Sequence, residues 1–267
     1  MAGWRDFWLR AALALALLTP LFFLLAAFGV KYQVFDWQFG VGVLALRVWP
    51  VFAAMALGVG LIAFVFSLIA RPGRGRRVAL AAISVPATAL AIFFVVTLNA
   101  ARLPPIHDIS TDLEDPPGFS PTVQAERALV RGGNGLDLKN ARVPNEPYAG
   151  EAAGVRVTAV QRAAYPDIQP IATGAEPGRA LAASRAVAAR LGWQIDRVDE
   201  KGGIIEARNT EFWFGAVADI SIRVTPAKPG SVIDIRSVSR VGVGDLGANA
   251  ERVRVFAREV AKELAAG

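Results

Sequence analysis

Ser237 to Arg252, SVSRVGVGDLGANAER, is the stretch on which the organisation of the second half of the chain depends. Just before it, Ile233 and Ile235 alternate with polar residues, which is the period of a strand with one buried face. At its end and beyond, Val253 and Phe256 begin an apolar pattern with helical spacing. The stretch therefore predicts the end of a strand, a glycine-rich turn and the start of the last helix.

The turn contains a glycine motif that resembles a dinucleotide-binding turn. Gly242, Gly244 and Gly247 have the G-x-G-x-x-G spacing of dinucleotide-binding turns. That motif also needs a second parallel strand and an acidic residue about 20 residues further on, whereas the residues after this turn predict one helix only. We therefore expect the glycines to turn the chain sharply and Asp245 or Asn249 to cap the helix.

Turn-linked segments with strand alternation precede this stretch. Residues 193–198 are followed by a Lys-Gly-Gly turn, and the segments 205–209, 219–224 and 233–236 alternate apolar and polar residues. This pattern is typical of an antiparallel sheet with one buried face. The other face is predicted to meet solvent with charges of both signs, namely Glu206, Arg208, Asp219, Arg223, Asp234 and Arg236.

Two helices are expected to cover the buried face of the sheet, at residues 176–191 and 247–265. The proline-rich residues 101–145 exclude a long regular element but allow an edge strand at 106–111 and a helix at 121–130 capped by Ser120. The ambiguous interval 148–168 holds a possible strand at 155–160.

Residues 1–100 contain three apolar runs, and the mean hydropathy of the chain, +0.39, is high for a soluble protein. A bilayer core about 30 Å thick needs about 20 helical residues, so transmembrane helices are predicted at about 11–30, 48–70 and 78–98. Arg47 and Pro50 divide the second run because an arginine in mid-bilayer is costly. The first run is too long for a signal peptide, the competing interpretation.

The predicted organisation is a membrane domain over residues 1–100 and a soluble domain over residues 101–267. The predicted fold class is α+β: three N-terminal transmembrane helices followed by an antiparallel β-sheet domain with helices packed on one face.

The net charge of +6 lies entirely in the membrane part. Residues 1–100 carry eight Lys/Arg and two Asp/Glu, whereas the remaining residues carry 21 of each. The soluble part therefore has no net basic field that would attract nucleic acid, and the expected partner is the lipid bilayer, with an envelope protein or a lipid as a further candidate. One side of the bilayer receives six arginines, Arg5, Arg10, Arg71, Arg74, Arg76 and Arg77, and the other receives Lys31, Arg47 and Arg102.

The positive-inside rule places the arginine-rich side in the cytoplasm. Three spans then put residues 101–267 on the opposite side. For a bacterial inner membrane, that compartment is the periplasm.

Several stretches together carry a family resemblance. The chain resembles the family of domains of unknown function numbered 1499, over roughly residues 104–263. The similar stretches are HDISTD at 107–112 with Pro116 and Pro117, Trp213-Phe214-Gly215, residues 219–224, and residues 237–252. The family has no established activity, so the resemblance implies no catalytic residues; it does imply a bacterial envelope protein.

The first candidate site is the HDISTD segment, His107 to Asp112, with Glu114 and Asp115 after it. One His with several carboxylates could hold a hard or borderline cation, or supply a general acid and base. The alternative is that Asp108, Ser110 and Asp112 fix an irregular segment through side-chain to backbone hydrogen bonds, which is what this composition favours.

The second candidate site is the stretch Ser237–Arg252 itself. Ser239 and Arg240 beside helix N-terminal amides could hold an anion, and the same group includes Asp245, Asn249 and Arg252. The structural alternative pairs Arg240 with Asp245 or Asp112. Phe212, Trp213 and Phe214 form a third group, interpreted as a plug at the edge of the core, with a bilayer-facing anchor or a pocket wall as alternatives.

The absence of cysteine excludes disulfides and thiolate metal sites, and a single His excludes a multi-His zinc site within one chain. No catalytic motif is complete, so we assign no catalytic residue, metal site or cofactor. The preferred hypothesis is a non-enzymatic binding or envelope structural role. The alternatives are a hydrolase or metal-dependent enzyme that uses the HDISTD segment, and a module that binds an anionic or lipidic ligand.

Overall fold

The computed structural model describes residues 2–70, 75–145 and 147–266. The chain divides into two compact units: Met1–Arg102 with Trp213–Gly215, and Leu103–Phe212 with Ala216–Gly267. Two arginines of the predicted cytoplasmic loop, Arg71 and Arg74, lie outside the described residues.

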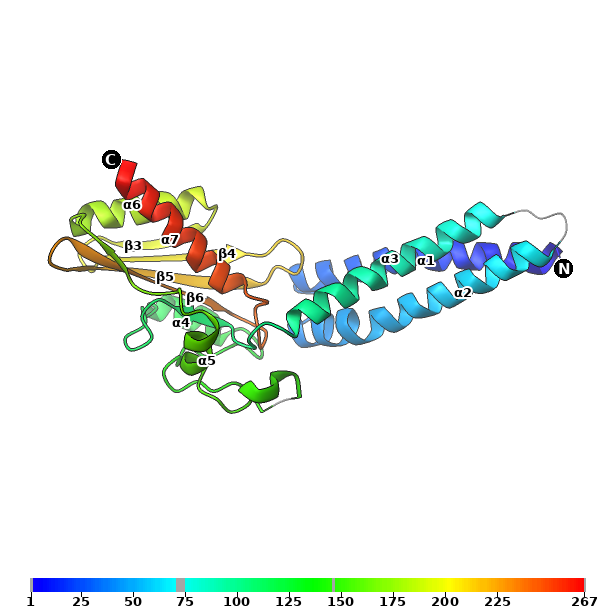
Figure 1. Ribbon diagram of the computed structural model, residues 1–267, viewed down its shortest axis with the longest axis horizontal. Helices are drawn as coiled ribbons and strands as arrows, with labels where there is room; N and C mark the ends of the chain where they lie inside the picture. Colours follow the sequence, from blue (N-terminus) through cyan, green and yellow to red (C-terminus); the bar gives the residue numbers. More distant parts are fainter. Residues whose placement is uncertain (1, 71–74, 146, 267) are drawn as a thin grey trace. The chain divides into compact units, whose positions relative to one another are not determined.

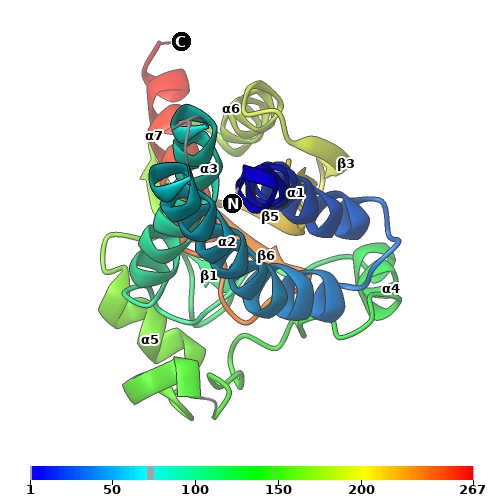
Figure 2. The same cartoon turned by 90° about the vertical axis from the view of Figure 1, so that its right-hand side faces the viewer.

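The first unit consists mainly of long apolar helices, shown end-on in Figure 2. They are α1 (Ala2–Lys31), the π-helix η1 (Gln38–Val48) with α2 (Trp49–Ile69), and α3 (Arg76–Ala100). Among the described residues, three helical stretches are long and apolar enough to cross a membrane, at Gly3–Lys31, Gln38–Ile69 and Arg76–Ala100. The prediction of three N-terminal membrane helices is thereby confirmed.

Small side chains bring these helices close together. Ala12, Ala16, Ala63 and Ala82 form a buried cluster between the helices, while larger apolar side chains such as Leu17 point outward. This arrangement is usual in lipid, where close backbone approach replaces the hydrophobic driving force. The predicted division of the second run near Arg47 is not a break in the helix: η1 ends at Val48, α2 follows directly, and the apolar helical stretch runs from Gln38 to Ile69.

The second unit contains a six-stranded antiparallel sheet in the order β1-β6-β5-β4-β3, and β2 also pairs with β6. Its strands are β1 (Asp108–Ser110), β2 (Ile171–Thr173), β3 (Gln194–Asp199), β4 (Ile204–Thr210), β5 (Val217–Pro226) and β6 (Ser231–Ser239). The predicted strands from 193 onward and the predicted edge strand near 106–111 are confirmed. The α+β fold class is confirmed with them.

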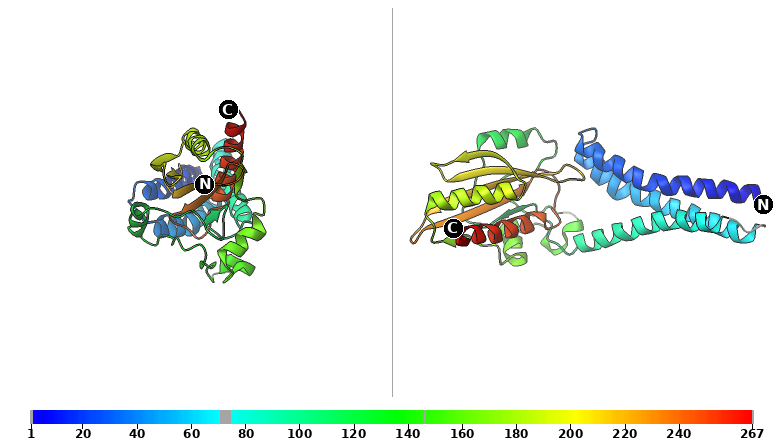
Figure 3. Two further views of the ribbon diagram at one scale, coloured as in Figure 1. Left: turned by 90° about the vertical axis from the view of Figure 1, so that its left-hand side faces the viewer. Right: turned by 90° about the horizontal axis from the view of Figure 1, so that it is seen from above.

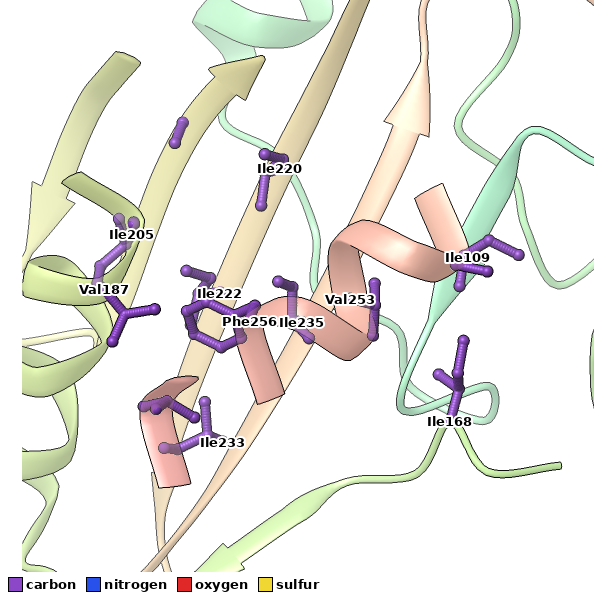
Figure 4. Close-up of a cluster of buried hydrophobic side chains, with 14 of the residues drawn as sticks. Ile109, Ile168, Val187, Ile205, Ile220, Ile222, Ile233, Ile235, Val253 and Phe256 are labelled. Atoms are coloured by element: carbon purple, nitrogen blue, oxygen red, sulfur yellow. The ribbon is translucent and has the colours of Figure 1, made fainter. Parts of the chain in front are cut away.

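One face of the sheet is covered by α6 (Pro177–Arg190) and α7 (Ala248–Ala266), which lie side by side over the strands (Figure 3). Figure 4 shows Phe256 of α7 beside Ile222 and Ile235 of the sheet. All three side chains are fully buried. This is the apolar core that the alternation in the sequence predicts.

The opposite face was expected to meet solvent, and this expectation is wrong. Glu206 and Asp219 are each only 2% exposed, and Asp234 and Arg236 are also buried. The cover is α4 (Pro121–Ala128) with the irregular segments on either side of it, and Figure 1 shows α4 on the side of the sheet away from α6 and α7. The α4 helix begins as predicted, with the Ser120 side chain accepting from the Val123 N–H.

One local prediction also fails, and two short elements were not predicted. The segment 155–160 is not a strand: α5 (Val157–Ala164) occupies it, with Val157 and Gln161 buried one helical turn apart. A β-branched run fits either structure until a tertiary contact selects one, and here burial on one helical face does so. The short strand β2 and the 3₁₀ helix η2 (Pro147–Ala152) were not predicted.

Candidate functional site

The two candidate motifs of the soluble part meet in the structure. Strand β1 pairs with β6 so that Asp108 lies opposite Val238 and Ser110 lies opposite Arg236. The outer edge of β1 is closed by Gln161 of α5, whose amide accepts from the Ser110 N–H at 3.1 Å and donates to the Ser110 carbonyl at 2.6 Å. The HDISTD segment therefore supplies an edge strand of the sheet, and the Gln161 side chain bonds to the outer side of that strand.

Asp108 forms a buried bidentate ion pair with Arg236. The guanidinium donates from Nε to Oδ1 at 3.0 Å and from Nη2 to Oδ2 at 2.7 Å. Arg236 also donates to the Pro117 and Leu136 carbonyls and lies over the Phe119 ring. These contacts place Arg236 between the sheet and the loops that cover it.

His107 and Asn249 connect β1 to α7 through a closed set of hydrogen bonds. His107 Nδ1 lies 3.1 Å from the Val243 carbonyl, and its own carbonyl accepts from Ser239 N and from Asn249 Nδ2. The fully buried Asn249 also donates to Ser239 Oγ at 2.9 Å and accepts from Ser237 Oγ at 2.7 Å. The polar atoms of this group are directed at one another.

Arg252 completes the same group. Its Nη1 donates to Ser237 Oγ at 3.1 Å and to Asn249 Oδ1, and its Nη2 donates to Glu211 Oε1 at 3.0 Å. Burial lowers the pKa of this guanidinium from its usual value, while Glu211 and Asp245 act in the opposite direction.

Asp245 caps α7, as predicted. Its carboxylate oxygens each accept a backbone N–H at 2.8 Å, from Gly247 and from Asn249. Burial raises the pKa of this carboxyl, and the two backbone hydrogen bonds lower it in part. The position that an anion would take at the N-terminus of α7 is therefore filled by a side chain of the protein itself, with Gly242 and Gly247 at positive φ in the turn.

The structural alternative expected Arg240 to pair with Asp245 or Asp112, and this expectation is wrong. Arg240 donates instead to Asp219, from Nε at 2.9 Å and from Nη2 at 2.7 Å, and to Glu126 of α4 at 2.8 Å. Asp219 also accepts from Arg127 Nη1 at 2.5 Å. We call Glu126, Arg127, Asp219 and Arg240 the Asp219 network; it joins α4 to strand β5 and to the end of β6.

The Asp219 network also raises the pKa of Arg240. Burial alone would lower the Arg240 pKa, but the hydrogen bonds to Asp219 and Glu126 outweigh burial and raise that pKa.

The acidic part of the HDISTD segment forms a turn. Asp112 Oδ1 accepts from the Glu114 and Asp115 N–H groups at 2.9 Å each, and its Oδ2 pairs with Arg223 at 3.2 Å. Ser110 Oγ donates to the Asp112 carbonyl at 2.8 Å. No group of three or more His, Asp and Glu side chains arranged to hold a metal ion is present within residues 2–70, 75–145 and 147–266.

Two hollows lie beside this turn, with volumes of about 290 and 170 Å³. Both are bordered by Thr111, Ile168 and Gln169, and Asp112 borders the smaller one. Asp167, at the larger hollow, pairs with Arg254 at 2.6 Å, and the pKa of Asp167 is lowered mainly by this hydrogen bond. Asp167 and Arg254, which both border the larger hollow, are therefore paired with each other.

The sequence analysis did not identify Glu126, Arg127, Asp219 and Arg236 as members of the polar site. The available signal was the equal number of acidic and basic side chains on one sheet face, next to a helix that carries Glu126 and Arg127. Alternation alone predicts which residues share a face; it does not predict whether water or a polar layer covers that face.

The aromatic triplet does not plug the core of the sheet. Phe212 and Trp213 are 64% and 52% exposed. Trp213–Gly215 belong to the first unit, where the Phe214 ring lies 5.8 Å from that of Phe23 and 6.1 Å from that of Trp37. The interpretation as a core plug is therefore wrong.

These features define a class of protein: a chain with three apolar helices able to span a membrane and an α+β domain whose sheet carries an apolar layer on one face and an ionic layer on the other. The chain belongs to the protein family of unknown function DUF1499, whose model matches residues 108–260. The matched region begins at β1 and ends in α7, so it covers the similar stretches from Asp108 onward. A search of curated proteins finds no match to the chain.

Proposed function

We propose that this protein is a membrane-anchored, non-enzymatic module whose α+β domain serves binding or the structure of the cell envelope. The observation that carries the proposal is the closed arrangement of the motif side chains. His107, Ser239 and Asn249 bond to one another or to backbone, and Asp108 and Arg240 lie in ion pairs. A catalytic group has to reach a substrate atom, whereas these groups are directed into the fold.

The main alternative is a metal-dependent hydrolase that uses His107, Asp108 and Asp112. The geometry disfavours it because Asp108 is bidentate to Arg236 and Asp112 bonds to two backbone amides and to Arg223. A carboxylate held in this way would have to leave its partners before it could bind a cation.

Metal analysis of the purified full chain distinguishes the two functions. We expect less than stoichiometric Zn²⁺, Mn²⁺ or Mg²⁺ after dialysis, and no difference in metal content between the wild type and Asp112→Asn. The matched control is Asp137→Asn, an exposed carboxylate that also caps a local turn. One equivalent of metal that is lost in Asp112→Asn but retained in Asp137→Asn would reject the proposal in favour of the enzyme.

For the membrane orientation, we propose that the N-terminus and the arginine-rich segment before α3 face the cytoplasm and that residues 101–267 face the periplasm of a bacterial inner membrane. The support is the distribution of charge, with six arginines on one side against three basic residues on the other.

Alkaline phosphatase fusions test this orientation, because the enzyme folds only where its disulfides form. A fusion after residue 267 should be active, and a fusion after residue 75, in the loop between α2 and α3, should be inactive. The reverse pattern would place the α+β domain in the cytoplasm and exclude the envelope role.

A further inference from the structure

The tip of the β4–β5 hairpin consists of Trp213, Phe214 and Gly215. Trp213–Gly215 group with the apolar helices of the first unit. The Trp213 ring lies 6.5 Å from that of Phe28, and the Phe214 ring lies 5.8 Å from that of Phe23, both on α1. Gly215 passes so close to the backbone of Lys31 that an added Cβ would lie 3.1 Å from the Lys31 Cα. From these contacts we infer that Trp213 and Phe214 lie in the lipid bilayer at the end of α1, and that phospholipid is the partner of this hairpin tip.

The position along α1 sets the depth of the tip. Lys31 ends the apolar run of α1, so it marks the level at which the helix leaves the hydrocarbon. With a rise of about 1.5 Å per residue, Phe28 is about 4.5 Å and Phe23 about 12 Å below that level. Rings that pack against these two residues are therefore within the apolar layer or at its boundary, since the hydrocarbon core is about 30 Å thick.

The chemistry of the tip fits this depth. Seven uncharged residues, FWFGAVA, separate Glu211 from Asp219. The Glu211 N–H donates to the Ala216 carbonyl at 2.8 Å, and this bond closes the hairpin. It also satisfies two backbone groups for which lipid offers no hydrogen-bond partner. Half of the Trp213 surface is not covered by protein, and tryptophan is enriched where a bilayer meets water.

The neighbouring surface of the first unit is equally apolar. Tyr32 and Val34, which follow α1, are exposed, and so is Phe39 of the π-helix. The hairpin tip thus extends a patch that the membrane helices already present to lipid. A bilayer covers this patch without a second protein, because the same helices must be surrounded by lipid in any case.

The chain contains no cysteine, so an introduced cysteine provides a unique site for a nitroxide spin label. The test uses the full chain reconstituted in vesicles of phosphatidylcholine and phosphatidylglycerol. Trp213→Cys probes the tip, and Lys201→Cys, in the exposed β3–β4 turn, is the matched control. The measured quantity is the ratio of nitroxide collisions with oxygen, which concentrates in lipid, to collisions with a water-soluble nickel chelate.

We expect this ratio to be several-fold higher at residue 213 than at residue 201. Equal ratios at the two positions would overturn the inference. Spin–spin broadening that persists at low protein-to-lipid ratio would also overturn it, because a second copy of the chain would then cover the tip. If Trp213→Cys fails to fold, quenching by brominated phosphatidylcholine replaces it: wild-type fluorescence should be quenched more than that of Trp213→Phe, and equal quenching rejects the inference.

Discussion

Asp219→Ala should lower the free energy of unfolding of the α+β domain by about 3–5 kcal/mol, the usual loss when one partner of a buried ion pair is removed. Asp219 is 2% exposed and accepts hydrogen bonds from both Arg127 and Arg240. Without this carboxylate, the two guanidinium groups remain between α4 and the sheet, where Arg127 is buried and Arg240 is largely buried. Arg240 retains Glu126, whereas Arg127 retains only backbone carbonyl partners among the hydrogen bonds described.

Hydrogen exchange read by mass spectrometry measures this loss on the full chain in detergent micelles. The most protected amides of β5 and β6 report global opening of the domain, so their exchange should accelerate by about two to three and a half orders of magnitude. Amides of α1 and α2 provide an internal reference, because the substitution lies in the other unit.

Glu251→Ala is the matched control for Asp219→Ala. Glu251 pairs with Arg258 at 3.2 Å, and both side chains are more than half exposed. Removal of an exposed pair of this kind costs about 0–1 kcal/mol. If Asp219→Ala costs no more than Glu251→Ala, the ionic layer does not hold α4 to the sheet and its structural interpretation fails.

Phe256→Ala should have an effect of similar size for a different reason. Phe256 is fully buried on α7, and its ring stacks on that of Trp193 with centroids 5.7 Å apart. Truncation removes the apolar contact with the sheet and leaves a cavity that rigid strands cannot close, a change that costs about 3–5 kcal/mol. We expect exchange in α7 and in the facing strands to accelerate together.

Leu264→Ala provides the comparison on the same helix. Leu264 is only partly buried, at the edge of the same core, so its truncation leaves surface that water can fill and the loss should be smaller. Equal losses at the two positions would mean that α7 is not held by its central aromatic contact.

Much of the fold follows from local sequence pattern. The membrane helices are predicted because about 20 apolar residues in a row have no other stable arrangement in lipid. The strands from β3 to β6 are predicted because alternation has a period of two, and α6 and α7 are predicted because their apolar spacing is helical. The segment 155–160 failed because its β-branched residues fit both periods, and its helix is selected by the burial of Val157 and Gln161.

The candidate site was only partly predictable. The sequence identified His107 and Asp108 in one candidate site and Ser239 and Asn249 in another, and only the pairing of β1 with β6 brings the two sites together. It did not identify the partners of Asp108 and Arg240, which come from positions more than 20 residues away along the chain. Such partners depend on strand order and register, which local propensity does not encode.

The sequence alone determined that the chain has a membrane part carrying all the surplus positive charge and an electrically balanced α+β part, because hydropathy and charge are sums over residues and need no coordinates. Only the tertiary structure decided that the charged face of the sheet is buried, that the HDISTD segment pairs with β6 beside the Ser237–Arg252 stretch, and that the Trp213 ring lies near that of Phe28 in α1. Each of these depends on which distant segment covers a surface, and the pattern of a strand specifies its two faces without specifying what lies against them.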